Sequence, residues 1–210
     1  SSLIPSLSRA AAEKNRRQIL SKIGSAIRFS MIIAIPSAVG LTVLAGPVSR
    51  LLFAGMDNEM LIQMMAVGSS AVVFFSLSTV SNAILQGINR MRVPIVNSAV
   101  SLGIHVAVLY VMLQVFHLGI YSVVYANIVF AALVCILNAV SIARYTRYRQ
   151  EVVRTFLIPC AASAVMGGAA WGIYRLCAKT LGNGFSTGAA ILVAMAVYFV
   201  LLILLRGVDE

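Results

Sequence analysis

Long apolar stretches separated by short polar segments dominate the chain. Six of them reach the length of about 20 residues that a helix needs to cross the hydrocarbon core of a bilayer. They cover residues 27–47, 61–86, 93–116, 118–142, 155–177 and 187–205. Pro94 falls in the first turn of the third stretch, where its missing N–H costs nothing. The pattern predicts an all-α, polytopic membrane protein with six transmembrane helices.

The segment before the first stretch has a helical pattern of its own. In SRAAAEKNRRQILSKIGSAIRFS, Ile19, Ile23 and Ile27 recur at helical spacing among lysines and arginines. This is typical of an amphipathic helix at the membrane interface that runs into the first span. A regulatory binding site is the alternative, and an interfacial anchor fits the pattern better.

The composition agrees with a membrane protein, and the positions of the basic residues indicate which side of the membrane carries the charge. Hydrophobic residues make up 60% of the chain and charged residues 10%, whereas a soluble domain is about half apolar and a quarter charged. With six spans, Arg50, Arg175 and Lys179 fall on one side of the membrane, and the other 13 of the 16 basic residues fall on the N-terminal side. The positive-inside rule predicts that both termini are cytoplasmic. This asymmetry explains most of the net charge of +10 without nucleic-acid binding.

Acidic side chains are absent from the predicted spans. None of the six acidic residues falls inside one, although an intramembrane carboxylate is the usual mark of a proton or sodium site. His105 and His117 stand alone, and the three cysteines form no CxxC pair. The sequence therefore predicts no catalytic residue, metal site or cofactor.

Two polar features interrupt the apolar spans. Asn97, Ser98, Ser101 and His105 share a sector of about 100° on the third span. They are candidate cavity-lining residues. Hydrogen bonds to neighbouring helices are the favoured explanation, and one wall of a hydrated cavity for a polar headgroup is the alternative.

The first span, MIIAIPSAVGLTVLAGP, contains a candidate hinge at Pro36, Ser37 and Gly40. Pro36 frees a backbone carbonyl, which in lipid must find another donor. Ser37 is placed to help. The break is either a fixed kink, which we favour, or a hinge.

Small residues and amides indicate where spans contact one another. Ser163 with Gly167, and Gly168 with Gly172, are small-xxx-small pairs that permit close backbone approach. In the fourth span, Asn127 and Asn138 fall on one face, where bonding between helices is expected.

The order of these features resembles the multidrug/oligosaccharidyl-lipid/polysaccharide (MOP) exporter superfamily. The resemblance rests on IPSLSRA, the basic amphipathic segment, IPSAVGLTVLAGPVSRLLF and SNAILQGINRMRVPIVNS. In the last of these a helix ends at LQG, a basic turn follows and Pro94 opens the next helix. The branch that looks closest is that of the polysaccharide biosynthesis proteins, which includes stage V sporulation protein B.

The resemblance implies two six-helix lobes around a central cavity, with two extra C-terminal helices in some members. The chain then looks like the C-terminal part of such a transporter, and it begins without an initiator methionine or a signal peptide. The implied organisation is a cytoplasmic amphipathic linker (1–26), four helices of the C-terminal lobe (27–142), a cytoplasmic basic loop (143–154), two extra helices (155–205) and a cytoplasmic tail (206–210).

The implied function is translocation of lipid-linked oligosaccharides or polysaccharide precursors by alternating access, for cell envelope or spore wall biosynthesis. The implied place is the bacterial cell membrane. The implied partners are an undecaprenyl-type glycolipid substrate, membrane lipids and the missing N-terminal part of the transporter. The alternatives are a multidrug exporter of the same superfamily, a non-transporting membrane anchor or assembly subunit, and a membrane glycosyltransferase. The last is disfavoured because no acidic pair lies at either membrane face.

Overall fold

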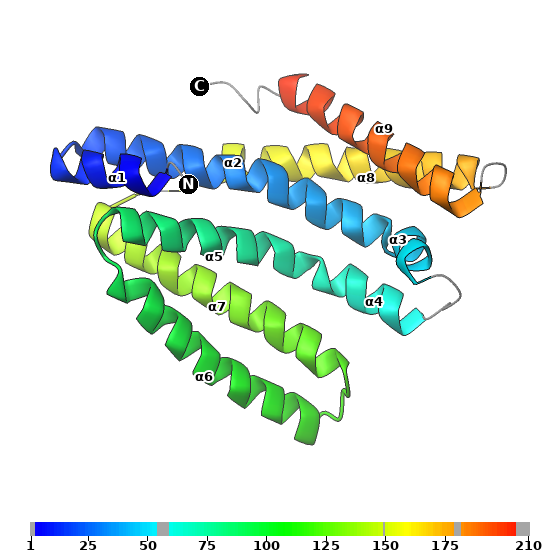
Figure 1. Ribbon diagram of the computed structural model, residues 1–210, viewed down its shortest axis with the longest axis horizontal. Coiled ribbons are helices and arrows are strands. Elements are labelled where there is room, and N and C mark those ends of the chain that lie inside the picture. The colour runs from blue at the N-terminus through cyan, green and yellow to red at the C-terminus, as the bar shows by residue number, and fades with distance from the viewer. Residues whose placement is uncertain (1–2, 54–58, 149, 179–181, 205–210) are drawn as a thin grey trace. The chain divides into compact units, whose positions relative to one another are not determined.

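The computed structural model describes residues 3–53, 59–148, 150–178 and 182–204, which are helical apart from short turns and contain no strand. In chain order the helices are α1 (Leu3–Ala12), α2 (Arg16–Val43), α3 (Ala45–Leu52), α4 (Glu59–Gly68), α5 (Ser70–Gly87), α6 (Arg92–Gln114), α7 (Tyr121–Thr146), the π-helical turn η1 (Val153–Leu157), α8 (Ile158–Cys177) and α9 (Gly182–Leu204) (Figure 1). Six helical segments of this part of the chain are long and apolar enough to span a membrane, with α4 and α5 together forming one of them. The predicted all-α, polytopic membrane class is confirmed.

The N-terminal segment forms two helices, where the sequence predicted one. Lys14 adopts a left-handed backbone conformation with φ of 52°, which ends α1. The Oδ1 of Asn15 then accepts the N–H of Gln18 at 3.2 Å, as an N-cap residue does. From Arg16 onward the helix continues without interruption into the first span.

The first span ends earlier than predicted, at Val43 instead of residue 47. Pro47 has no N–H to donate to the carbonyl of Val43, which favours the end of α2 at that residue. After a turn at Leu44 the chain starts the short helix α3, which contains Arg50. The expected break at Pro36, in contrast, lies inside a continuous helix.

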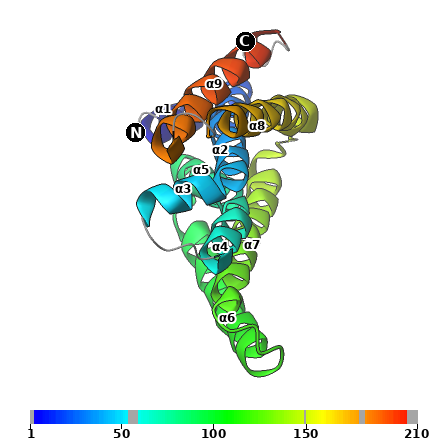
Figure 2. The ribbon, with the colours of Figure 1, turned by 90° about the vertical axis from the view of Figure 1, so that its right-hand side faces the viewer.

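The chain divides into two compact units. The first comprises residues 1–31 and 73–151, and the second comprises residues 32–72 and 152–210. Within the first unit, α6 and α7 pack side by side as a hairpin, which both views show (Figures 1 and 2). Within the second unit, α8 and α9 form a second hairpin, and α3 packs against α4 and α9.

The core of the second unit is built from small residues. Ala162, Ala170 and Ala190 are buried with Met166 and Tyr198 between α8, α9 and the C-terminal part of α2. A Cβ atom at Gly167 would lie 3.0 Å from the Val39 side chain and 3.2 Å from Val43. Small side chains therefore let α8 approach α2 closely, as the pair of Ser163 and Gly167 predicted.

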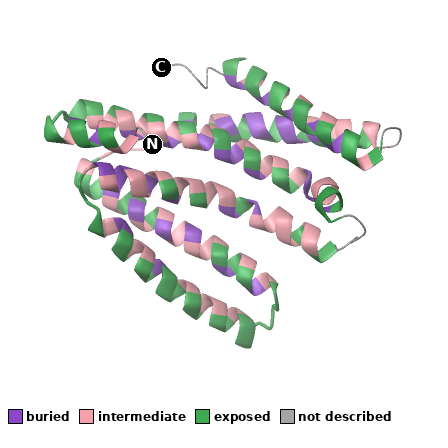
Figure 3. Cartoon of the chain, viewed as in Figure 1, coloured by how far each residue is buried: buried purple, intermediate pink, exposed green. Residues whose placement is uncertain are grey.

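The exposed surface of α6 is mostly apolar. Residues classed as exposed run along most of α6, whereas buried residues recur along α8 (Figure 3). The exposed side chains of α6 include Ile95, Val106 and Tyr110. A helix whose exposed surface is this apolar suits a lipid environment, where no water is needed to solvate side chains.

Candidate functional site

The polar face predicted on the third span lies on α6, and two of its residues bind α7. Asn97 and His105 are half-buried and bond to α7, while Ser101 is fully buried. Ser98 is half-buried, and its hydroxyl makes no hydrogen bond with any residue that the structure describes. The four candidates therefore differ in environment although they share one sector of the helix.

Three side-chain amides form a hydrogen-bonded chain across three helices. The Nδ2 of Asn97 donates to Oδ1 of Asn138 at 2.9 Å and to Oγ of Ser141 at 3.3 Å. The Nδ2 of Asn138, which is fully buried, donates in turn to Oδ1 of Asn82 at 2.7 Å. Side-chain bonds thus connect α6, α7 and α5. Asn127, the other amide of α7, is exposed.

His105 bonds to the backbone of the neighbouring helix. Its Nδ1 lies 2.9 Å from the carbonyl oxygen of Ala126, and its ring meets the ring of Phe130 edge-on, with centroids 5.6 Å apart. A carbonyl can only accept, so Nδ1 carries the proton in this contact.

Ser101 and Ser122 are buried with hydroxyl groups that have no partner among the described residues. A buried hydroxyl is normally hydrogen-bonded, and leaving it without a partner costs free energy. These two hydroxyls, on α6 and α7, are therefore available for a further polar partner.

The backbone carbonyl left free by Pro36 accepts a hydrogen bond from a residue that the sequence did not predict. The carbonyl that Pro36 cannot reach is that of Ile32, and the hydroxyl of Tyr198 on α9 donates to it at 2.7 Å. Ser37 donates instead to the carbonyl of Ile33, also at 2.7 Å. Gly40 faces the Met166 side chain, with 4.0 Å between the Met166 Cε and the Cβ that a larger residue would carry. Tyr198 supplies the donor that the interrupted helix needs.

The sequence contained a feature that could have identified Tyr198 as a residue that bonds to another helix. It is the one residue with a hydroxyl group between residues 188 and 204, in the most hydrophobic span of the part of the chain that the structure describes. A tyrosine in such a position usually finds a hydrogen-bond partner. Its partner could not be predicted, because the hydrophobic pattern of each helix does not determine the register between α9 and α2.

The candidate metal ligands among the described residues do not form a cluster. No group of three histidine, cysteine, aspartate or glutamate residues there could hold a metal ion. Glu59 is the first residue of α4, where a negative charge favours the positive end of the helix dipole. Asp57, Asp209 and Glu210 lie outside the described residues.

Comparison with known proteins identifies the family. The model of a family described as lipid II flippase MurJ matches residues 1–201 of the chain. The chain belongs to the MurJ family. MurJ belongs to the MOP exporter superfamily, so the predicted resemblance is confirmed. Proteins of the MurJ family are membrane transporters and not catalysts of a chemical reaction.

One curated MurJ protein shows how much of a whole flippase the similarity covers. The lipid II flippase MurJ of Bacillus subtilis strain 168 is 28% identical over 97 residues, which is 45% of this chain and 18% of that protein. The chain thus matches less than a fifth of the relative's length. No solved structure matches the chain.

Two of the motifs behind the superfamily resemblance contact each other in this MurJ-family chain. A Cβ atom at Gly87, the glycine of LQG, would lie 2.7 Å from the Cβ of Leu7 in IPSLSRA. Ser8 of the same motif donates to the carbonyl of Gly87 at 3.2 Å. The glycine permits α1 to pack on the end of α5. This close contact explains why both motifs contain these residues.

Proposed function

We propose that the protein carrying this chain moves a lipid-linked glycan precursor across the bacterial cell membrane. The match of the MurJ family to residues 1–201, in a chain with six membrane-spanning helices, carries this proposal. The curated relative is named a lipid II flippase, so the substrate class is an undecaprenyl-type lipid with a glycan headgroup. The headgroup crosses through a cavity by alternating access while the lipid tail stays in the bilayer. No cofactor is involved.

In this proposal the chain is the C-terminal part of the transporter. Its first four spans are the last four helices of the second lobe, and α8 and α9 are the two extra helices. The N-terminal part of the same protein is its partner around the cavity. The distribution of basic residues supports a cytoplasmic location of both termini.

The function can be tested in bacteria whose own lipid II flippase is depleted. Expression of the full-length protein should restore growth and the appearance of lipid-linked precursor on the outer leaflet. Failure to restore precursor translocation by a protein that reaches the membrane contradicts the proposal. Drug resistance without precursor translocation would favour the multidrug exporter instead.

The polar face of α6 is the proposed wall of the cavity. The unbonded, buried hydroxyl of Ser101 supports a role beyond packing. Single cysteines at Asn97, Ser101 and His105 in the cysteine-free, full-length protein should react with water-soluble thiol reagents in at least one conformational state. Complete protection in every state refutes the cavity wall and leaves the hydrogen bonds between helices as the role of these residues.

Pro36, Ser37 and Gly40 form the proposed hinge. The missing backbone bond at Ile32 and the position of the boundary between the two compact units, between Met31 and Ile32 in the same helix, support it. Hinges commonly lie at a few positions that absorb a change in backbone angles. Pro36→Ala should leave membrane insertion intact and reduce transport by the full-length protein. Unchanged transport contradicts the hinge and identifies a fixed kink.

A further inference from the structure

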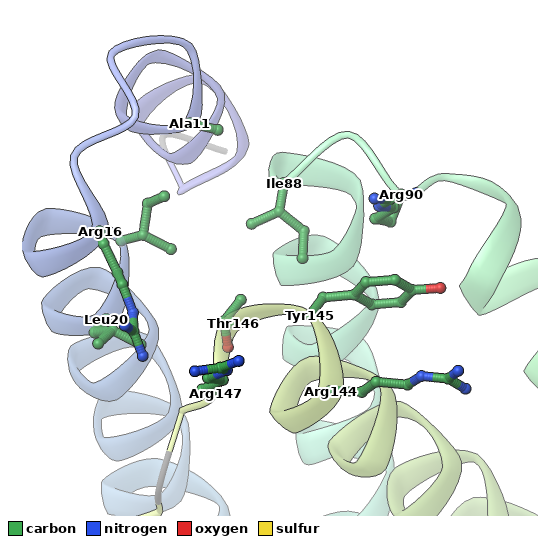
Figure 4. A pocket seen from close by; sticks show the side chains of 10 residues that line it. Ala11, Arg16, Leu20, Ile88, Arg90, Arg144, Tyr145, Thr146 and Arg147 are labelled. Atoms are coloured by element: carbon green, nitrogen blue, oxygen red, sulfur yellow. The ribbon is translucent and has the colours of Figure 1, made fainter.

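A basic pocket lies at one end of the first unit, where α1, α2, α5 and α7 begin or end (Figure 4). Its volume is about 570 Å³. Its lining residues are Ala11, Arg16, Ile19, Leu20, Ile88, Arg90, Arg144, Tyr145, Thr146 and Arg147. Four of the ten are arginines and none is acidic.

The arginines of the basic pocket have no carboxylate partner in the part of the chain that the structure describes. The ion pair found there joins Arg9 to Glu13, outside the pocket. The guanidinium groups of Arg16, Arg144 and Arg147 donate no hydrogen bond to any described residue. Four unpaired cations around one space repel one another, so a bound anion lowers the energy of the arrangement.

The protein holds two of these cations by means other than ion pairs. The guanidinium carbon of Arg90 lies 4.6 Å from the centroid of the Tyr145 ring, a cation–π contact. Arg147 caps α7 with a left-handed backbone conformation (φ of 55°), which is uncommon outside glycine and asparagine. The hydroxyl of Thr146 donates to the carbonyl of Ile142 and accepts the N–H of Tyr148, which ties down this turn.

The cations fall into two groups within the basic pocket. Arg16 and Arg147 reach into the space between α2 and the end of α7, whereas Arg90 and Arg144 flank Tyr145 (Figure 4). Ile19, Leu20 and Ile88 supply the apolar part of the lining. Guanidinium groups match the oxygens of a phosphate, and the apolar side chains suit the carbon atoms attached to it.

We propose that the basic pocket binds the phosphate of an anionic membrane lipid headgroup, separately from the transported substrate. The pocket lies at the ends of membrane-spanning helices, where phospholipid headgroups are concentrated, and basic pockets between such helices recognise anionic lipids. A water-soluble phosphate compound offers the same charge but has no use for the apolar lining.

The test measures lipid binding by the purified full-length protein in detergent, with phosphatidylglycerol and phosphatidylcholine as probes and native mass spectrometry as the readout. The wild type should retain phosphatidylglycerol in preference to phosphatidylcholine. The double substitution Arg16→Gln and Arg147→Gln should weaken phosphatidylglycerol binding by about tenfold. Phosphatidylcholine binding should stay as it was.

The matched control is the double substitution Arg17→Gln and Arg92→Gln. These arginines are exposed, lie near the same helix ends and do not line the basic pocket, and their loss changes the net charge equally. The control should retain wild-type selectivity. Equal loss in both variants shows a general attraction of charge and overturns the proposal, as does unchanged binding in the pocket variant.

Two further experiments test the need for a guanidinium group and distinguish a lipid from a soluble phosphate compound. Arg147→Lys preserves the charge but removes the paired donors, so it should weaken phosphatidylglycerol binding without affecting folding; full retention of binding overturns the phosphate site. Glycerol 3-phosphate serves as the soluble competitor. If it displaces the lipid at equal concentration, the site takes a soluble phosphate compound and the lipid assignment is overturned.

Discussion

The hydrogen bond from Tyr198 to the Ile32 carbonyl shows how a side chain on one helix allows a proline inside another. Pro36 removes the backbone donor for the Ile32 carbonyl, and in lipid an unpaired carbonyl is costly. Tyr198 supplies the missing donor from a helix more than 160 residues further along the chain. Among the described residues no such donor reaches the carbonyl of Val43, which Pro47 leaves without a backbone partner, and α2 ends at Val43. The same residue type therefore interrupts one helix and leaves the other continuous.

Tyr198→Phe is expected to destabilise the protein by about 1 kcal/mol, because it removes one hydrogen bond between helices and leaves the Ile32 carbonyl unpaired. Equilibrium unfolding of the purified full-length protein measures the change. Tyr110→Phe is the control, since Tyr110 is 66% exposed and its hydroxyl makes no hydrogen bond with any described residue.

A double-mutant cycle separates this explanation from general packing. In a Pro36→Ala background, residue 36 can donate to Ile32, so Tyr198→Phe should cost less than about 0.5 kcal/mol. An unchanged cost in that background means that the hydroxyl of Tyr198 does not serve the proline break.

At the scale of the helices, the two units use different means to bring spans together. The first unit links α5, α6 and α7 through buried amides, and the second brings α8 against α2 through small residues. Both means suit a membrane interior, where burial of apolar surface adds little between helices already surrounded by lipid. Polar bonds and close packing then determine which helix faces pair.

Asn138→Ala should destabilise the protein by about 1–3 kcal/mol, because it leaves the amides of Asn82 and Asn97 without their shared partner. Thermal unfolding of the full-length protein measures the loss. Asn127→Ala, on the same helix but exposed, should change stability by less than about 0.5 kcal/mol. Equal effects of the two substitutions contradict the role of the amide chain.

Gly167→Ala should destabilise the protein by about 1–3 kcal/mol, because the new methyl group would meet Val39 and Val43 at 3.0 and 3.2 Å and β-branched side chains adjust poorly. Gly168→Ala is the matched control, because no atom beyond its own turn of helix lies within 4 Å of the added carbon, and it should be neutral or slightly stabilising. Unfolding measurements that rank the two in the opposite order refute close packing at Gly167.

At the scale of the whole molecule, the proposed orientation places the two ends of the α6–α7 hairpin on opposite sides of the membrane. Arginines gather where α6 begins and α7 ends, and the turn between the two helices carries none. This distribution supports a cytoplasmic location of the basic pocket.

Thiol labelling in intact cells tests this orientation. A cysteine that replaces Leu118, exposed in the turn between α6 and α7, should react with a membrane-impermeant maleimide. A cysteine that replaces Arg17 should react only after the cells are permeabilised. The reverse pattern would place both termini outside and contradict the proposal.

The sequence by itself determined the class, the number of spans and the superfamily. These follow from local properties, because a span of about 20 apolar residues, a loop rich in arginine and a motif are each contiguous in the chain. It also indicated which helix faces are polar or small. The positions of Asn97, Asn138 and Gly167 on those faces needed no tertiary information.

Only the tertiary structure decided which of these residues meet. Tyr198 and Ile32, Asn138 and Asn82, and Gly87 and Leu7 are far apart in the sequence, and their pairing depends on the register between packed helices. The arginines of the basic pocket come from three separate segments, each of which resembles an ordinary basic loop when it is considered alone. Hydrophobic periodicity fixes the buried face of a helix, but not the partner that covers it.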